Sequence, residues 1–285
     1  MESELWPAVY QIVMESGKKC EVRDVTYSNR RIVLVYLWSV LHDRPVSWGC
    51  RKVNWPPAAR RGRLPVPSTM TRRLRTASVR RLLEEVQRRL RGRFGQSDRK
   101  WIDAKPLPVG HSSHDRDARC GRGDGGLAKG YKLYAVCDAG GVLDTWAVLP
   151  MNVNEKKVAG HLLRHTPGGG WMVGDSQYDS NRLYDLAPRW GFRWLTPLRR
   201  GEALGHHYQS PWRLAARAVL DTAFGQALWR ERYGIDRYFG HLTNFGGGLS
   251  PLPNWVRTFR RVRLWVCAKI ILHMILMDQR RPHAA

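Results

Sequence analysis

The order of strand-like and helix-like segments after residue 100 limits what this chain can fold into. Five apolar segments are typical of strands, at residues 101–109, 129–139, 142–150, 168–176 and 192–198. Helical patterns occupy residues 154–165 and 180–190, most of 211–244, and the chain from about 255. A polar loop is expected at residues 110–128. The order β-β-β-α-β-α-β-α predicts a mixed α/β fold.

The chain before residue 98 carries helical signals instead. Three residues are expected to cap helices there: Ser28, Ser68 and Thr76. The helix after Thr76 should reach about residue 93. Its apolar residues recur at spacings of three and four, which predicts one buried face: Val79, Leu82, Leu83, Val86 and Leu90. We therefore expect a small all-α region at residues 1–97 and an α/β domain at 98–285.

Positive charge is concentrated beside that boundary. The chain has 48 Lys and Arg against 24 Asp and Glu, a net charge of +24. Residues 51–100 hold 16 basic and three acidic residues, more than half of the excess. Short helices with a basic surface suit a DNA-binding domain, because they can neutralise phosphates. A helical packing module with a solvated arginine surface is the alternative.

The sequence gives no sign of secretion or of membrane insertion. Its five cysteines are scattered and form no CxxC pair, so neither a disulfide framework nor a zinc ribbon is expected. The first residues lack the basic and apolar parts of a signal peptide. The most apolar stretch, 264–277, is too short to span a bilayer and predicts a buried helix. We expect a reduced, soluble, cytoplasmic protein without a membrane partner.

Two carboxylates stand at the ends of predicted strands. Asp103 lies in WIDAKPLP and Asp175 in WMVGDSQYDS. Carboxylates that leave a sheet edge, joined by a third from a helix, can hold two Mg²⁺ ions for phosphoryl transfer. Aspartates also end strands as turn formers, so this pattern alone is weak.

An ordered set of motifs resembles a known family. The segments IDAKPLPV, RG followed by AKGYKLYAVCD, VGDSQYDS and RERYGIDRYFGHL are similar to the catalytic domain of DDE-type transposases from bacterial insertion sequences. The resemblance covers about residues 98–275. It implies an RNase H-like fold, in which two strand aspartates and one acidic residue of a late helix bind divalent metal. On that resemblance, Asp103 and Asp175 match the first two acidic positions.

The third acidic position departs from the family pattern. The family usually has a YxxRxxxE helix followed by lysine. Here Asp236 replaces the glutamate, four residues after Arg232. Trp229 replaces the tyrosine, and Thr243 stands where the lysine is expected. Glu231 is the other candidate, and on one continuous helix it would point about 140° away from Asp236.

The resemblance implies an activity, a cofactor and partners. Such transposases cleave DNA at transposon ends and join the freed 3′-OH to target DNA, with Mg²⁺, or Mn²⁺ in its place, as two bound ions. Double-stranded DNA and a homodimer that synapses two ends are the implied partners. Arg232 and Arg237 would contact phosphate near the cut. A looser likeness at LPVPSTMTRRLR points to Arg72, Arg73 and Arg75 as DNA contacts. A catalytically inactive DNA-binding relative and a non-transposing nuclease are the alternatives.

Other groups of residues carry weaker signals. His111, His114 and Cys120 have a spacing that could suit zinc. Asp179 could cap a helix, and Asp138 lies in the expected turn 138–141. Aromatic side chains near the second and third acids could stack on an unpaired base: Trp194, Trp212 and Trp229.

Overall fold

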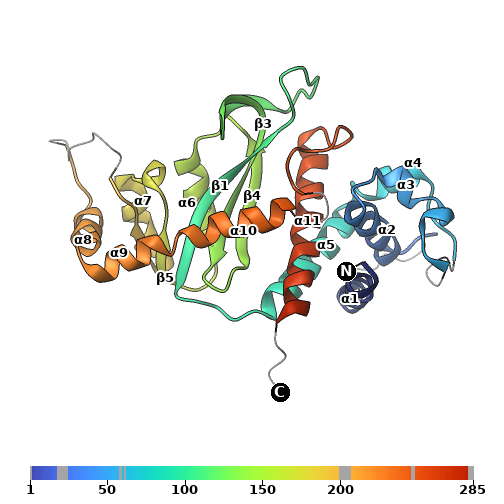
Figure 1. The fold of residues 1–285 in the computed structure, drawn as a ribbon, viewed down its shortest axis with the longest axis horizontal. Coiled ribbons are helices and arrows are strands. Elements are labelled where there is room, and N and C mark those ends of the chain that lie inside the picture. The colour runs from blue at the N-terminus through green and yellow to red at the C-terminus, as the bar shows by residue number, and fades with distance from the viewer. Residues whose placement is uncertain are drawn as a thin grey trace. The chain divides into compact units, whose positions relative to one another are not determined.

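The computed structural model describes residues 2–17, 25–57, 60, 62–198, 207–244 and 248–281. The chain forms two compact units (Figure 1). A helical unit contains residues 1–94, 244–249 and 260–285, and a sheet unit contains 95–243 and 250–259. The last helix of the chain therefore belongs to the same unit as the first ones. The assignment of residues 1–97 to DNA binding and 98–285 to catalysis stays a prediction.

The sheet unit is built on six strands. They are β1 (Arg99–Pro108), β2 (Arg119–Gly123), β3 (Gly126–Asp138), β4 (Leu143–Pro150), β5 (Gly170–Val173) and β6 (Phe192–Leu195). Strand β3 pairs antiparallel with β1, β2 and β4, whereas β1, β5 and β6 run parallel. The sheet order is β2-β3-β1-β5-β6, and β4 pairs with the part of β3 that follows its pairing with β2. The predicted mixed sheet is confirmed.

Helices flank this sheet, so the predicted α/β class is confirmed as well. They are α6 (Glu155–His165), α7 (Asn181–Leu186), α8 (Pro211–Leu220), α9 (Ala223–Arg230) and α10 (Tyr233–Asn244), with short 3₁₀ turns η3 (Ser176–Tyr178) and η4 (Ala187–Trp190). Helix α6 packs on β3 and β4. Asn154 caps it, since its side chain accepts the N–H groups of Lys156 and Lys157.

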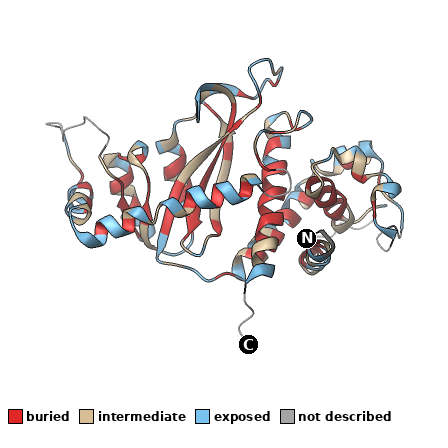
Figure 2. Ribbon diagram, viewed as in Figure 1, coloured by how far each residue is buried: buried red, intermediate tan, exposed pale blue. Residues whose placement is uncertain are grey.

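The helical unit confirms most of the N-terminal predictions. Its elements are α1 (Glu2–Gly17), α2 (Asn29–Leu41), α3 (Val46–Gly49), η1 (Lys52–Asn54), α4 (Pro67–Arg73), α5 (Ala77–Gly92) and α11 (Phe259–Arg280). Ser28 caps α2 by accepting the N–H of Arg31 at 3.2 Å. The apolar face predicted for α5 is buried, and so is most of α11 (Figure 2). None of the described helices is long and apolar enough to cross a membrane.

Three local predictions were wrong. The polar stretch 110–128 holds strand β2 and the first residues of β3. Helix α4 starts one residue before Ser68, with Pro67 in the first turn, where its fixed φ is favourable and no N–H is needed. The final helix begins at Phe259 rather than near 255.

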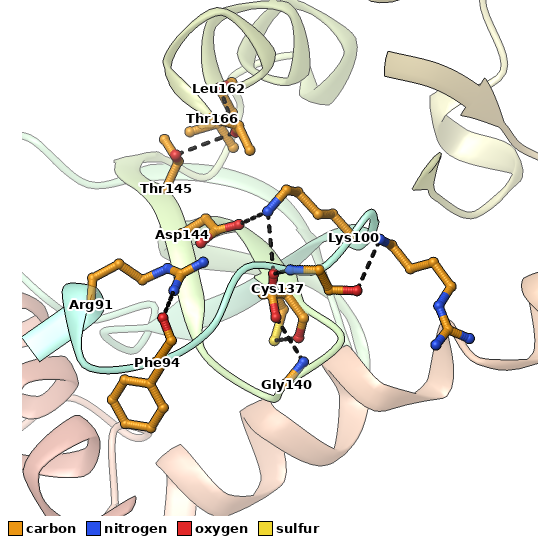
Figure 3. A network of polar contacts seen from close by, with 12 residues as sticks. Arg91, Phe94, Lys100, Cys137, Gly140, Asp144, Thr145, Leu162 and Thr166 are labelled. Atoms are coloured by element: carbon orange, nitrogen blue, oxygen red, sulfur yellow. Dashed lines mark hydrogen bonds and ion pairs between the residues drawn. The ribbon is translucent and has the colours of Figure 1, made fainter. Parts of the chain in front are cut away.

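A buried ionic network fixes the start of β1 (Figure 3). Lys100 is fully buried, and its ammonium pairs with the carboxylates of Asp144 and Asp138, the latter at 3.3 Å. Asp138 also accepts the N–H groups of Ser97 and Gly140, both at 2.8 Å. Its predicted place in a turn is confirmed, and its carboxylate ties that turn to β1.

Candidate active site

The first predicted acid, Asp103, lies on the face of β1 that α10 covers. Side chains alternate along a strand, so Asp103 shares its face with Trp101. Gly234 of α10 rests on the Trp101 ring, where an added Cβ would lie 2.4 Å from a ring atom. A side chain at position 234 would therefore push α10 away from the strand. This close approach sets the start of α10 over the first residues of β1.

The second acid reaches the same region from the neighbouring parallel strand. Trp101 of β1 pairs with Val173 of β5, and Asp103 and Asp175 each lie two residues further along. Asp175 caps the turn η3, and its Oδ1 accepts the N–H of Gln177 at 2.8 Å. The expected place of Asp103 at a strand end is wrong, because β1 continues to Pro108; the parallel register of β1 and β5 explains how two acids 72 residues apart come together.

The start of α10 adds a cation and the third acid. The Arg232 Nη1 lies 3.7 Å from Asp103 Oδ2 and 3.8 Å from Asp236 Oδ2. The side chain of Arg232 is 14% exposed and that of Asp236 is 49% exposed. Among the described residues, the buried Nε of Arg232 has no hydrogen-bond partner. The Arg232 guanidinium thus lies between two of the predicted metal ligands, Asp103 and Asp236, without forming a short ion pair with either.

The helix assumed to contain both Glu231 and Asp236 is broken. Helix α9 ends at Arg230 and α10 begins at Tyr233, so the angle expected for one continuous helix does not apply. Glu231 accepts two hydrogen bonds from Arg99 Nη1, at 2.6 and 2.8 Å. It is therefore already engaged by a cation.

The electrostatics of this region disfavour full ionisation. Burial, together with the charges of Asp175 and Asp236, raises the pKa of Asp103 to about 7, against the opposing effects of the Ala104 N–H and Arg232. Burial likewise raises the pKa of Asp175, opposed by the Gln177 N–H and by Arg232. Carboxylates in this state gain stability from any additional cation, because a cation offsets their repulsion.

Comparisons with known proteins identify the family of the chain. The family described as Transposase DDE domain matches residues 95–275, more than half of the chain. The chain belongs to this transposase family. It is also similar to the transposase for insertion sequence element IS1106 of Neisseria meningitidis serogroup B, with 30% identity over 137 residues. That match covers 45% of this chain and 46% of the relative, so the chain aligns with less than half of the curated protein's length. No solved structure matches the chain.

The acids of this DDE-family chain suit divalent metal in their chemistry. Hard cations such as Mg²⁺ prefer carboxylate oxygens, and Asp103 and Asp175 are two such groups that have only the loosely paired Arg232 as a counterion. Within the described residues, no group of three or more His, Cys, Asp or Glu side chains stands ready to enclose an ion. Asp236 would have to turn inward, and Arg232 would have to leave its place, for all three acids to share one cation.

Sequence reasoning missed several buried polar residues near these acids. Arg213 of α8 forms a buried two-pronged pair with Asp179, one hydrogen bond of which is 2.8 Å long. The predicted capping role of Asp179 is wrong, because Ser180 is the N-cap of α7. Lys132 Nζ lies 2.6 Å from Glu155 Oε1. Among the described residues, the buried hydroxyl of Tyr178 has no hydrogen-bond partner. These pairings join residues 23 to 34 positions apart, and no local motif marks them.

The arginines predicted to contact DNA differ in their surroundings. Arg72, Arg75 and Arg237 are exposed. Arg73 donates to Asn29 Oδ1 at 2.7 Å and so connects α4 to α2. Its role as a DNA contact stays a prediction.

The weaker candidates gain little support from the structure. His111 and His114 lie in the loop before β2, and no described residues form a zinc-like cluster with them. Trp194 is 3% exposed within β6, so stacking of this side chain on a base is excluded in the described fold. Trp212 is 54% exposed, and its stacking role stays a prediction.

Proposed function

We propose that the chain is a DNA transposase that cleaves DNA at transposon ends and joins the freed end to target DNA. One observation carries this proposal. The pairing of β1 with β5 brings Asp103 and Asp175 together in a chain of the DDE family, and the charge of Asp175 raises the pKa of Asp103. The relative from Neisseria meningitidis carries the same function in its name.

The proposed reaction uses carboxylates as metal ligands and needs no protein nucleophile. Asp103, Asp175 and Asp236 would hold Mg²⁺, with Mn²⁺ as a substitute, as two ions. Bound metal would supply activation of the attacking hydroxyl and neutralisation of the phosphate oxygens. In this arrangement Asp103, whose pKa of about 7 lets it hold a proton in the free protein, would give up that proton to become a ligand.

Arg232 would position the scissile phosphate. Its guanidinium lies within 4 Å of two acids and can turn toward a phosphate oxygen, for which it has bidentate geometry. Arg237 would bind phosphate further from the cut. Residues 1–97, with Arg72, Arg73 and Arg75, would recognise double-stranded DNA at the ends. Two copies of the chain would synapse two ends.

A second candidate is a catalytically inactive DNA-binding relative. The half-exposed Asp236, one methylene shorter than the usual glutamate, favours it. A non-transposing nuclease on the same fold is the third, and strand-transfer products would distinguish the transposase from it.

The deciding experiment measures Mg²⁺- or Mn²⁺-dependent cleavage of DNA that carries the element's own ends. It compares the wild type with Asp236→Asn and Asp236→Glu, and follows DNA binding in parallel. The proposal expects cleavage by the wild type and its loss in Asp236→Asn while binding persists. An inert wild type that cleaves only after Asp236→Glu would identify a disabled relative.

A further inference from the structure

The hairpin of β2 and β3 extends the sheet and is held in place by contacts with other parts of the chain. We name residues 110–130, with β2 and the start of β3, the β2–β3 arm. Its base is tied to the segment before α11. Asp115 is buried and accepts both the Tyr131 hydroxyl and the Thr258 N–H at 2.9 Å. Asp117 accepts the N–H of Phe259, also at 2.9 Å. Gly121 lies so close to Met151 that an added Cβ would be 2.4 Å from its carbonyl oxygen.

The acidic residues of the arm are all engaged within the chain, whereas its arginines are not. Asp115 and Asp117 hold the backbone, and Asp124 pairs with Lys105 at 3.1 Å. Arg116, Arg119 and Arg122 are exposed. In the described ranges, no hydrogen bond, ion pair or ring contact joins the guanidinium groups of these three arginines to another residue. The arm therefore presents three exposed guanidinium groups that form no close pair with a carboxylate.

A hollow of about 840 Å³ lies beside the first of these arginines. Loop 109–117 and residues 254, 257 and 258 line it. The residues that line it include His111, His114 and Arg116, and Arg257 is held by carbonyl oxygens that include Pro253 at 2.7 Å. Donors around a concave, open surface suit a sugar-phosphate backbone better than they suit an apolar ligand.

We propose that the β2–β3 arm binds the phosphate backbone of the DNA duplex whose end lies at the acidic site. This inference rests on the proposed transposase function and adds to it a second contact within the sheet unit. The spacing follows from the register. Arg119 pairs with Gly130, and Gly130 pairs with Pro108, five residues beyond Asp103 on β1. Five residues of strand span about 17 Å, which matches about five base pairs of DNA.

The arm should therefore contact phosphates about four to seven base pairs from the cut. An arginine-rich edge could instead serve only to prevent pairing with another sheet edge. A glutamate at the same positions would prevent such pairing equally well, but it would repel DNA. Charge reversal separates the two roles.

The first test compares Arg119→Glu/Arg122→Glu with Arg189→Glu/Arg182→Glu, two exposed arginines outside the arm. Binding of end DNA is measured in the full-length chain at several salt concentrations. We expect the arm variant to bind at least tenfold more weakly, with the slope of log K against log salt reduced by about two. The milder Arg119→Gln/Arg122→Gln should lose part of the affinity. Equal slopes in the folded arm and control variants would refute the proposal.

The second test uses a natural residue of β2. Cys120 is exposed and free, whereas Cys137 and Cys267 are buried. A duplex with a thiol tether five base pairs from the cut should form a disulfide with Cys120, and one tethered fifteen base pairs away should not. Cys120→Ser should abolish the product. Equal capture at both positions would overturn the proposed path.

Failure of the arm and failure of catalysis are distinguishable. A chain that binds DNA through the arm but never cleaves it retains this inference and loses the proposed function. If reversal of the arm's charge leaves DNA cleavage unchanged, the proposed function is retained and this inference is lost. If arm reversal changes the oligomeric state without DNA and leaves DNA affinity unchanged, the arm is a protein interface, and the inference is wrong.

Discussion

Two groups of carboxylates lie along strand β1 in contrasting electrostatic states, one around Lys100 and one around Asp103. At its start, Lys100 is enclosed with Asp138 and Asp144, and backbone N–H groups complete the coordination of Asp138. Three residues further along β1, Asp103 is repelled by the charges of Asp175 and Asp236. Its cationic neighbour, Arg232 Nη1, is 3.7 Å away. The first group is complete within the chain, and the second gains by binding a cation from outside. A buried acid that the fold leaves unbalanced is more informative about function than one that it neutralises.

Breaking the balanced group should have the largest effect on stability. Lys100→Met leaves two buried carboxylates without their cation, so we expect a loss of about 3–5 kcal/mol in the free energy of unfolding. Urea unfolding measures it. The control is Lys157→Met, an exposed position that should change little. Adding Asp144→Asn to Lys100→Met should recover part of the loss, and no recovery would mean that packing rather than charge is responsible.

The unbalanced group should respond in the opposite direction. Asp103→Asn removes a repelled carboxylate, and its Oδ1 can still accept the Ala104 N–H. The acid's pKa is about 7 in the folded chain against 3.8 ordinarily, so the folded state keeps a proton that the unfolded state releases. Wild-type stability is thus full below about pH 4 and falls as pH rises toward 7. We expect the variant to be more stable by about 2 kcal/mol at pH 8, with little difference at pH 4.

The pH series of urea unfolding tests this expectation directly. Asp185→Asn serves as a matched control on α7, outside the acidic group. A variant that is less stable than the wild type at pH 8 would show that Asp103 is already well compensated in the metal-free chain.

Added Mg²⁺ should offset the charge of the carboxylates around Asp103, as Lys100 offsets that of Asp138 and Asp144. Mg²⁺ at about thirtyfold above its Kd would stabilise the wild type by about 2 kcal/mol, since it binds only the folded state. The gain should be larger at pH 8 than at pH 6, because protons compete for Asp103 with its pKa near 7. Thermal unfolding with and without Mg²⁺ measures it. Asp103→Asn should lose the gain, and Lys157→Met should retain it.

The contrast also explains which features the sequence could reveal. Asp175 follows the apolar strand β5 and Asp103 lies within β1, and strand periodicity is a local signal that could indicate both places. Asn154 and Ser28 cap helices through bonds to residues two or three positions away. Such interactions join residues that are close in the sequence, so a local motif can predict them.

Features that depend on distant partners were not predictable in this way. Strand β2 contains RCGRG, whose exposed arginines and glycines lack alternation because it pairs on one side only. The break between α9 and α10 is not marked in the sequence, because residues 231–232 contain no proline and no change in the apolar pattern. The pairing of Lys100 with Asp138 and Asp144 crosses 38 and 44 residues, and nothing near Lys100 announces it.

The smallest expected effect sharpens the comparison by moving one residue back along β1. Arg99 pairs with Glu231 at 2.6 Å, but both side chains are more than a third exposed, at 45% and 37%. Water already solvates these charges, so Glu231→Gln should cost only about 0.2–1 kcal/mol, and less at high salt. Urea unfolding at low and high salt measures the difference. If Glu231→Gln instead abolishes metal-dependent cleavage without a loss of stability, Glu231 rather than Asp236 supplies the third carboxylate. The neighbours Arg99 and Lys100 would then differ in role because they differ in burial. The exposed pair of Arg99 would lie at the metal site, whereas the buried pairs of Lys100 stabilise the fold.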